Sequence, residues 1–483
     1  MPKFTGTNTI HFMNTDYQFG MIGLGVMGQN FLLNMADHGY KVIGFDKDPS
    51  KTSALESAAT EGTTVKGVGT LEDMLRQLET PRKIMMLVPA GKPVDDVIAS
   101  LLPLVEPGDI IIDGGNSHFT DTLRRVNFLS EKKLHFIGMG VSGGEEGARK
   151  GPSIMPGGDA VAYPFIKPML EAVSAHVQGE PCVAYMGKGA AGHYVKMVHN
   201  GIEYAIMQLI SETYDVLHRG LGLDNDQLAA VYREWNAGEM QSFLLEITAD
   251  IFRQPDDKTS NRLVDMILDK AGSKGTGKWT SQDALNLPAP IPVIDIAVTM
   301  RNISSFKDDR LAAAELYKMA IKPISGKPEL VIRQVQDALF FATVMCYAQG
   351  LFMLHSASAE LEMDIPLADV VRIWRGGCII RSGLLEVFYK AHKKNKGLGN
   401  ILLDKNIARL VKKKEKNVRA VLKMALNSRI PAAGLMNALS YFEASTTPVM
   451  PVNLIQAQRD YFGAHTYQRT DREGVFHTSW NHY

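Results

Sequence analysis

Short apolar runs alternate with stretches of helical periodicity from Tyr17 to about residue 190. Runs that are apolar throughout are typical of strands buried on both faces of a parallel sheet. Successive parallel strands need long crossovers, and the helical stretches between the runs supply them. The alternation therefore predicts an α/β domain, a parallel sheet with helices on both faces. The predicted strands are YQFGMIGL, KVIGFD, KIMMLV, DIIIDGG and LHFIGMGV.

A glycine pattern closes the first predicted strand and opens the first predicted helix. Gly23, Gly25 and Gly28 form GxGxxG, which is weak alone but specific between a strand and a helix. The glycines permit a tight turn, and the helix N-terminus attracts a pyrophosphate. Asp46 ends the second predicted strand, where an acid can bind a ribose 2′-hydroxyl. Residues 17–190 are therefore predicted to form a dinucleotide-binding, Rossmann-type domain.

The loops after the later strands are the other candidate parts of the cofactor site. In such folds the ligand lies outside the carboxyl ends of the strands. VPAG (88–91) and DGGNSHF (113–119) follow two of these strands, and Asn116 is the polar residue best suited to contact near a nicotinamide. The candidate cofactor contacts are Gly23, Leu24, Gly25, Val26, Met27, Gly28, Asp46, Lys47, Asp48, Val88, Pro89, Ala90 and Asn116.

The second half of the chain has a different character. From about residue 191 the strand signal ends, and residues 191–448 are predicted to form a large all-α domain. Residues 449–483 are too apolar for a disordered tail and too irregular for another bundle helix. The first 16 residues form an extension without the features of a targeting segment. The predicted helical segments are 192–219, 226–252, 293–319, 327–361 and 405–425.

Composition excludes several classes of function. Lys plus Arg and Asp plus Glu both number 52, which gives no overall charge for binding nucleic acid or a membrane surface. Two lysine-rich stretches lack the interleaved aromatic residues of a nucleic-acid platform. The three cysteines have no metal-ligand spacing and indicate a reducing compartment, the cytoplasm. No uninterrupted apolar run approaches the length needed to cross a bilayer.

The stretch KMVHNGIEY (196–204) carries the candidate chemistry. Lys196, His199, Asn200 and Glu203 follow the i, i+3, i+4, i+7 spacing that places side chains on one helical face, and Tyr204 lies beside them. Apolar residues fill the neighbouring face. An ordinary solvated face would carry scattered Lys and Glu pairs. This face instead presents a base, an acid and hydrogen-bonding groups after a glycine-rich approach.

At this point the chain resembles the 6-phosphogluconate dehydrogenase family over nearly its full length, the first 16 residues excepted. The resemblance implies oxidation of 6-phosphogluconate at carbon 3 and loss of CO2 to give ribulose 5-phosphate, in the pentose phosphate pathway and gluconate utilization. The stretches that carry it are GLGVMGQN, IIIDGGNS, GVSGGEEGARKGPSIMPGG, GAAGHYVKMVHNGIEY, GSKGTGKWT, IWRGGCIIR and NLIQAQRDYFGAHTY.

The resemblance also implies roles for individual residues. Lys196 matches the base that takes the 3-hydroxyl proton, and Glu203 matches the acid that protonates carbon 1 of the enediol. No metal is required. The family is homodimeric, and its tail reaches into the partner's active site. The implied substrate contacts are Asn116, Ser142, Gly143, Gly144, His199 and Asn200 for the carboxylate and hydroxyls, and Tyr204, Lys274, Thr276, Arg301, Arg459 and His465 around the phosphate.

The residues after the second predicted strand depart from the family pattern. NADP-using members commonly have Asn-Arg-Thr there, whereas this chain has Asp46, Lys47 and Asp48. A carboxylate repels a 2′-phosphate, and lysine lacks the planar fork of arginine. The cofactor is expected to be NADP or NAD, and Asp46 favours NAD.

Two other readings stay open at this stage. The first is a related β-hydroxyacid dehydrogenase acting on another sugar acid or a small acid, which would lack the long helical domain and the phosphate-binding tail. The second is a non-catalytic dinucleotide-binding protein, which would have no chemical need for both Lys196 and Glu203.

Overall fold

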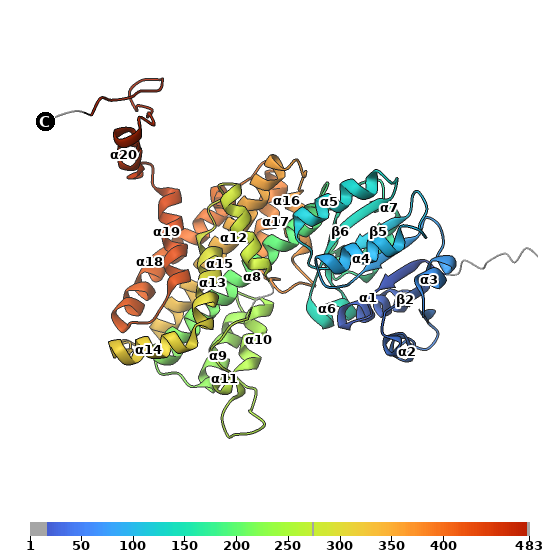
Figure 1. The fold of residues 1–483 in the computed structure, drawn as a ribbon. Coiled ribbons are helices and arrows are strands. Elements are labelled where there is room, and N and C mark those ends of the chain that lie inside the picture. The colour runs from blue at the N-terminus through green and yellow to red at the C-terminus, as the bar shows by residue number, and fades with distance from the viewer. Residues whose placement is uncertain (1–16, 273–274, 481–483) are drawn as a thin grey trace, which may run out of the picture.

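The computed structural model describes residues 17–272 and 275–480, so the N-terminal extension and Lys274 lie outside the described residues. The two predicted halves lie side by side, a sheet domain and a helical bundle (Figure 1). The strands of the sheet domain are β1 (Phe19–Ile22), β2 (Val42–Phe45), β3 (Val65–Val68), β4 (Lys83–Met86), β5 (Ile110–Asp113), β6 (His135–Ser142) and β7 (Ser153–Gly158), and a separate small hairpin is formed by β8 (His176–Val177) and β9 (Glu180–Pro181).

The seven strands have the order β3-β2-β1-β4-β5-β6-β7. All neighbouring pairs are parallel except β6 and β7. The five predicted strands are confirmed as β1, β2, β4, β5 and β6. Strands β3 and β7 were not predicted. The sequence of β3 is VKGV at a sheet edge, and that of β7 is SIMPGG, so neither has a continuous apolar run.

Helices cover both faces of the sheet. Apolar residues of α1 and α7 pack on one face, and those of α3, α4 and α5 pack on the other. Alternate residues of one strand serve opposite faces, because side chains alternate along a strand: Ile110 and Ile112 belong to the first layer and Ile111 to the second. These helices are α1 (Val26–Asp37), α2 (Pro49–Ser57), α3 (Leu71–Gln77), α4 (Lys92–Leu101), α5 (Phe119–Ser130), α6 (Gly144–Lys150) and α7 (Tyr163–Val173).

The second half is helical, as predicted, but two predicted helices are each broken in two. Segment 226–252 is interrupted by a turn at 237–240, and Ser242 then caps the helix that follows. Segment 293–319 is interrupted at Phe306. The elements are α8 (Ala191–Asp215), the π-helical turn η1 (Val216–Gly220), α9 (Asn225–Asn236), α10 (Phe243–Ile251), α11 (Leu263–Met266), α12 (Thr276–Asn286), α13 (Pro292–Ser305), α14 (Lys307–Tyr317), α15 (Pro328–Glu360), α16 (Leu367–Ile373), α17 (Leu384–Lys394), the 3-10 turn η2 (Ile401–Leu403), α18 (Lys405–Ser428), α19 (Ala433–Thr446) and α20 (Val452–Gly463).

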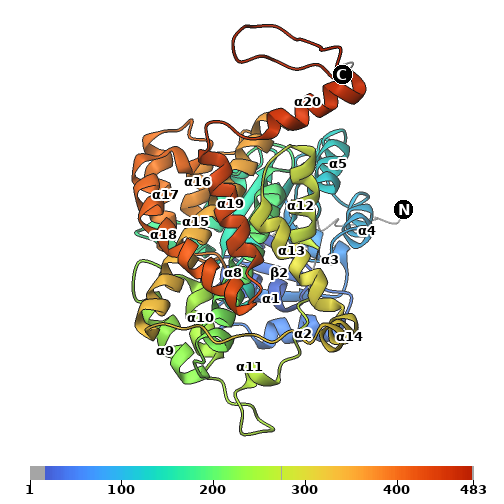
Figure 2. The ribbon, with the colours of Figure 1, turned by 90° about the vertical axis from the view of Figure 1, so that its left-hand side faces the viewer.

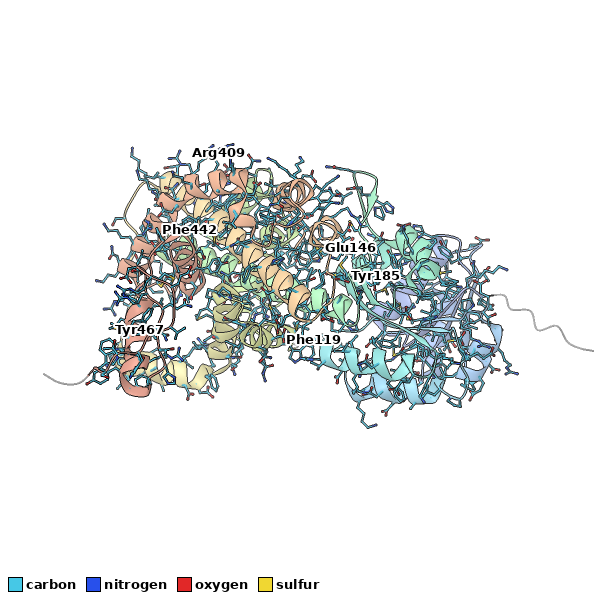
Figure 3. All side chains as sticks on the ribbon, turned by 90° about the horizontal axis from the view of Figure 1, so that it is seen from above. Phe119, Glu146, Tyr185, Arg409, Phe442 and Tyr467 are labelled. Carbon is cyan, nitrogen blue, oxygen red and sulfur yellow. The ribbon has the colours of Figure 1, made fainter. Side chains whose placement is uncertain are left out.

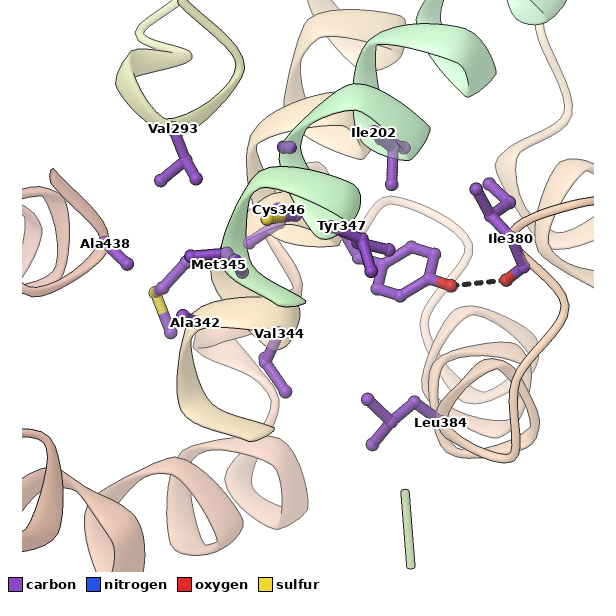
Figure 4. Close-up of a cluster of buried hydrophobic side chains, with 14 of the residues drawn as sticks. Ile202, Val293, Ala342, Val344, Met345, Cys346, Tyr347, Ile380, Leu384 and Ala438 are labelled. Carbon is purple, nitrogen blue, oxygen red and sulfur yellow. Dashed lines mark hydrogen bonds between the residues drawn. The ribbon is translucent and has the colours of Figure 1, made fainter. Parts of the chain in front are cut away.

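Helices α8 and α15 form the centre of the bundle (Figure 4). In this core the Tyr347 hydroxyl donates to the Ile380 carbonyl at 2.5 Å, which satisfies the polar end of a fully buried aromatic side chain. Helix α15 is long and apolar enough to cross a membrane by length and composition alone. Its apolar window is 89% buried inside the protein, so α15 has the character of a core helix.

The tail departs from the sequence prediction, because it begins with a regular helix, α20. This helix leaves the bundle after α19 and lies beyond it (Figures 1 and 2). Tyr467, which follows α20, lies at the end of the molecule opposite the sheet, whereas Phe119 lies near the junction of the two halves (Figure 3). The large side chains of α20 are exposed, including those of Leu454, Tyr461 and Phe462. The prediction that the tail is not another bundle helix describes its position but misses its helical content.

Candidate active site

The polar face of α8 is buried where the helix passes the sheet. Lys196 is 7% exposed and His199 is fully buried. This depth depends on a close approach of α8 to β6, because a Cβ placed on Gly140 would lie 2.5 Å from the Cβ of Lys196. Any larger residue at that position would push α8 away from β6. The polar stripe of α8 is therefore not an ordinary face exposed to solvent.

The predicted residues of α8 lie together with the end of β6. Ser142 Oγ is 3.3 Å from His199 Nε2, and His199 Nδ1 is 3.1 Å from Asn200 Oδ1. Glu203 lies one turn further along, with an oxygen 3.9 Å from His199 Nδ1. Hydrogen bonds thus connect Ser142 of β6 through His199 to Asn200, and Glu203 lies next along the same face of α8. Gly143, the residue before α6, has a φ of 110°. Gly144 is the first residue of α6 and is exposed.

Burial shifts the acid and base properties of this row in opposite directions. Burial lowers the pKa of Lys196, and the carboxylate of Glu203 opposes part of this change. Burial raises the pKa of Glu203, with Lys196 and Arg301 opposing it. Burial and the neighbouring Lys196 together hold the pKa of His199 well below its usual value. Burial therefore shifts Lys196 toward its neutral form and Glu203 toward its protonated form.

The loop after α16 closes the site from behind, and sequence reasoning assigned no role to its residues. Trp374 meets the ring of His199 edge-on, with centroids 5.7 Å apart. Cys378 is fully buried beside Lys196, and burial raises the pKa of its thiol to about 12. The stretch IWRGGCIIR was already part of the family resemblance, so a signal for this loop was present in the sequence.

A second cluster lies further along α8. The Arg301 guanidinium stacks over the ring of Tyr204 at 3.5 Å, and its Nη1 donates to the Gly272 carbonyl at 3.3 Å. Thr276 is the first residue of α12, next to the region of Lys274. Helices α8, α12 and α13 meet at this cluster, because a Cβ on Gly277, next to Thr276, would lie 2.4 Å from the Tyr204 ring. The cation of Arg301 beside tyrosine and threonine hydroxyl groups suits an anionic ligand.

Arg459 and His465 are not near this cluster within one chain. Both are exposed in the tail, which extends beyond α19 (Figure 2). The side-chain hydrogen bonds described for residues 456–480 all end within that range. A cleft of about 680 Å³ runs beside Arg301 and is also lined by Lys270 and Arg310.

The carboxyl ends of β1, β2 and β4 surround a cleft of about 430 Å³. Gly23 has a φ of 94°, and a Cβ there would lie 2.5 Å from the Leu87 carbonyl oxygen, so the turn requires glycine. A Cβ on Gly25, before the first turn of α1, would meet no atom within 4 Å. This open space in front of a helix N-terminus fits the pyrophosphate of a dinucleotide. The lining includes Gly23, Gly25, Asp46, Lys47, Lys51, Val88 and Pro89.

The other predicted cofactor residues differ in their hydrogen bonds and in their exposure to solvent. The Asp46 carboxylate accepts from the Leu24 amide at 2.8 Å and from the Asp48 amide at 3.0 Å, and Lys51 Nζ lies 3.5 Å away. Asp48 caps α2 through Ser50 and is outside the lining of the cleft. Asn116 and Ala90 are exposed at loop positions, and Val26 is 57% exposed. Met27 and Gly28 lie in the first turn of α1.

Comparison with known families decides which dinucleotide enzyme this arrangement belongs to. The family model described as the NAD binding domain of 6-phosphogluconate dehydrogenase matches residues 18–187, and that of the 6-phosphogluconate dehydrogenase C-terminal domain matches residues 192–480. The chain belongs to the 6-phosphogluconate dehydrogenase family. It is therefore an oxidoreductase with a dinucleotide cofactor.

Individual members of the 6-phosphogluconate dehydrogenase family are similar along the whole chain. A Bacillus subtilis protein named NADP(+)-dependent, decarboxylating 6-phosphogluconate dehydrogenase is 50% identical, over 96% of this chain and 99% of its own length. A decarboxylating enzyme of Lactococcus lactis is 47% identical, over 96% and 98%. The Plasmodium falciparum 6-phosphogluconate dehydrogenase, solved alone, with NADP+ and with 6-phosphogluconate, has a TM-score of 0.93 at 44% identity, covering 96% of this chain and all of that one.

Proposed function

We propose that the protein oxidises and decarboxylates 6-phosphogluconate to ribulose 5-phosphate and CO2, the reaction of the pentose phosphate pathway and of gluconate utilization. The observation that carries this proposal is the pair formed by Lys196 and Glu203, a buried lysine of lowered pKa and a carboxyl of raised pKa on one face of α8. A base and an acid with pKa values shifted toward neutrality suit proton transfer in both directions.

Lys196 is proposed to act first. Its neutral amine removes the proton of the 3-hydroxyl. A dinucleotide held in the cleft at the ends of β1, β2 and β4 would supply the acceptor for the hydride from carbon 3. The resulting 3-keto acid loses CO2 readily once its carbonyl oxygen is polarised, and the protonated Lys196 supplies that polarisation. The same proton can pass to the oxygen as the enediol forms. Because the lysine serves these steps, we propose that no metal is needed.

Glu203 is proposed to complete the reaction as an acid. Burial raises the pKa of its carboxyl, which favours the protonated form that an acid needs. Transfer of that proton to carbon 1 gives the ketose product. Ser142, His199 and Asn200 would hold the substrate's carboxylate and hydroxyls in register with these two groups, together with the backbone of Gly143 and Gly144 and with Asn116.

The phosphate site is proposed to be completed by a second copy of the chain. Tyr204, Thr276, Arg301 and Lys274 would form one side of it, and Arg459 and His465 of the partner's tail the other. Two observations support this: the cleft beside Arg301 lies open, and the exposed tail carries apolar side chains that a monomer leaves unburied. Residues 17–190, 191–448 and 449–483 would then be the cofactor domain, the substrate and dimerisation domain, and the exchanged tail.

The preferred dinucleotide is proposed to be NAD, although the Bacillus and Plasmodium relatives are named or solved with NADP. Asp46 lines the cleft at the end of β2, where its carboxylate would accept from a ribose hydroxyl and repel a 2′-phosphate. We expect the enzyme to work in the cytoplasm, in keeping with three free, buried cysteines.

A steady-state assay tests the proposal. Purified protein is incubated with 6-phosphogluconate and either NAD or NADP, while reduced dinucleotide and CO2 are followed together. We expect one CO2 for each reduced dinucleotide. Gluconate and 3-hydroxyisobutyrate serve as comparison substrates. Higher turnover of either one, or dinucleotide reduction without CO2, would favour the related β-hydroxyacid dehydrogenase reading instead.

A further inference from the structure

The tail is folded around a single carboxylate. Asp460, on the last turn of α20, is fully buried although almost every neighbour in the tail is exposed. Oδ1 accepts from the Thr466 amide and from His477 Nδ1, both at 2.9 Å. Oδ2 accepts from the Thr478 amide at 3.0 Å and from Trp480 Nε1 at 2.8 Å. Four donors from residues 466–480 thus meet on one side chain of α20.

These contacts frame the turn that carries His465. Ala464 and Thr466, on either side of it, have φ values of 49° and 62°, a left-handed conformation that non-glycine residues adopt only when held there. Asp460 holds the amide of Thr466, and Gln456 of α20 donates to its carbonyl at 2.5 Å. A Cβ on Gly463 would lie 2.7 Å from the imidazole, so the ring lies directly against the end of the helix.

The same carboxylate also joins the end of the chain to this turn. Tyr467 and Phe476 exchange backbone hydrogen bonds at 2.8 Å and close a hairpin. His477, Thr478 and Trp480 then return to Asp460. Burial alone would raise the pKa of Asp460, but the donors from His477, Thr478, Trp480 and Thr466 together hold it well below its usual range. The four donors therefore favour the charged form of the carboxylate.

We infer that Asp460 is the positioning residue of the phosphate-binding pair: it holds the turn of His465 against the end of α20, the helix that carries Arg459, in the geometry that a partner's active site requires. This inference rests on the proposed role of Arg459 and His465. Asp460 itself faces into the tail and would touch no substrate. The residues after Phe476 gain a role by the same argument, because they supply three of the four donors.

Asp460→Asn gives the primary test. The amide would keep one acceptor oxygen, but its NH2 group would face two donors where Asp460 now accepts, leaving donors unpaired. We expect the KM for 6-phosphogluconate to rise at least about tenfold. The KM for the dinucleotide, the dimer and the Tm of the main unfolding transition should stay unchanged. Asp471→Asn is the matched control, since Asp471 is a carboxylate of the same tail whose ion pairs among the described residues are with Arg469 and Arg472.

A mutant cycle separates positioning from general damage. In an Arg459→Ala, His465→Ala background, Asp460→Asn should raise the KM for 6-phosphogluconate no further, because the residues through which it acts are gone. An additive effect there would overturn the inference, as would an unchanged KM in Asp460→Asn alone. If Arg459→Ala and His465→Ala leave the KM unchanged as well, the proposed phosphate site itself is wrong.

Milder variants cover the case in which Asp460→Asn does not fold. Trp480→Phe removes one donor and keeps an aromatic side chain, and a chain ending at Phe476 removes three donors. We expect a small rise in the KM for 6-phosphogluconate from the first variant and a rise close to that of Asp460→Asn from the second. Equal losses in the KM values of both substrates and in kcat would indicate a merely structural role and contradict the inference.

Discussion

The two parts of the molecule that carry the candidate substrate contacts are built in opposite ways. On α8, the charged and polar side chains are buried, and β6 and the loop after α16 enclose them. In the tail, Arg459 and His465 are exposed, while the group buried beneath them, Asp460, organises the backbone. The first region is enclosed by elements of the same chain. In the second, the side-chain hydrogen bonds described for residues 456–480 stay within the tail.

The two kinds of construction suit two different tasks: proton transfer on α8 and phosphate binding by the tail. Burial on α8 shifts the pKa values of Lys196 and Glu203, which proton transfer requires. A phosphate site needs permanent cations instead, and arginine remains charged wherever it lies. Such groups can be supplied by a mobile or exchanged element without loss of function. We therefore expect mutations on α8 to act mainly on kcat and mutations in the tail to act mainly on KM.

The largest effect is expected for Lys196→Met. The side chain is proposed to serve as base and then as acid, and such catalysis typically contributes about 10²–10⁴-fold at each transfer. Loss of kcat by roughly 10³-fold or more is expected for both dinucleotide reduction and CO2 release. Lys188→Met is the control, because Lys188 lies just before α8 but is exposed and paired with Asp364. A variant that keeps its kcat and loses only substrate affinity would contradict the assignment.

Removal of the tail after residue 448 should have the next largest effect. Loss of the partner's cations is expected to raise the KM for 6-phosphogluconate about 100-fold, the range for truncating one side of a buried charge contact. The measurement is a steady-state assay together with sedimentation to determine the oligomeric state. A truncated enzyme that is monomeric and fully active would rule out tail exchange.

Mixed dimers give a sharper version of this experiment. A full-length Lys196→Met chain has a tail but no base, and a truncated chain has the base but no tail. Co-expression should restore activity, because the full-length chain lends its tail to the intact site of its partner. If the tail instead served its own chain, no dimer of these two chains would be active.

Glu203→Gln tests the coupling between acid and base on α8. We expect kcat to fall by roughly 10²-fold, since the final protonation loses its acid. The carboxylate of Glu203 raises the pKa of Lys196, so its removal should lower that pKa further. Lys196 must be neutral to act, and kcat/KM falls as pH drops through its pKa. The acid limb of the pH profile should therefore move to lower pH in Glu203→Gln; a shift to higher pH would show that the two groups are not coupled in this way.

Much of the fold could be predicted because the relevant patterns are local. The five buried strands and the GxGxxG turn are each visible in a short stretch of sequence, and the polar stripe of α8 follows from helical spacing alone. Strands β3 and β7 were missed because their residues are half-buried or interrupted by proline and glycine. The helix α20 was missed because its apolar residues are exposed, so its pattern does not match a helix packed on its own core.

For the candidate site, too, the sequence predicted the residues that share a local pattern and missed those brought in by tertiary packing. Sequence spacing placed Lys196, His199 and Glu203 together, but it could not show that the loop with Trp374 and Cys378 lies against them, about 180 residues later in the chain. Such contacts depend on how the bundle packs on the sheet. Asp460 was also missed: its partners lie in a tail without regular periodicity, and only the backbone geometry brings them to one carboxylate.

The smallest expected effect concerns the cofactor cleft, which lies apart from both regions. The Asp46 carboxylate lies at the end of β2, held by the amides of Leu24 and Asp48, so it cannot turn away from the cleft without breaking both hydrogen bonds. A 2′-phosphate brings close to two negative charges to that place, and a carboxylate about 4 Å away costs on the order of several kcal/mol at an effective dielectric near 20.

Lys47 and Lys51 offset only part of this repulsion, since Lys51 is already 3.5 Å from Asp46 and both are solvated point charges. We therefore expect a higher kcat/KM with NAD than with NADP in the unmodified enzyme. Asp46→Asn combined with Lys47→Arg removes the repulsion and adds a planar donor, and it should shift the ratio of the two kcat/KM values toward NADP by roughly tenfold, about 1.4 kcal/mol. Lys51→Gln is the companion variant, and it should move the ratio slightly the other way. A clear preference of the unmodified enzyme for NADP would mean that binding displaces Asp46 from its two amides, and the shift on substitution would then be small.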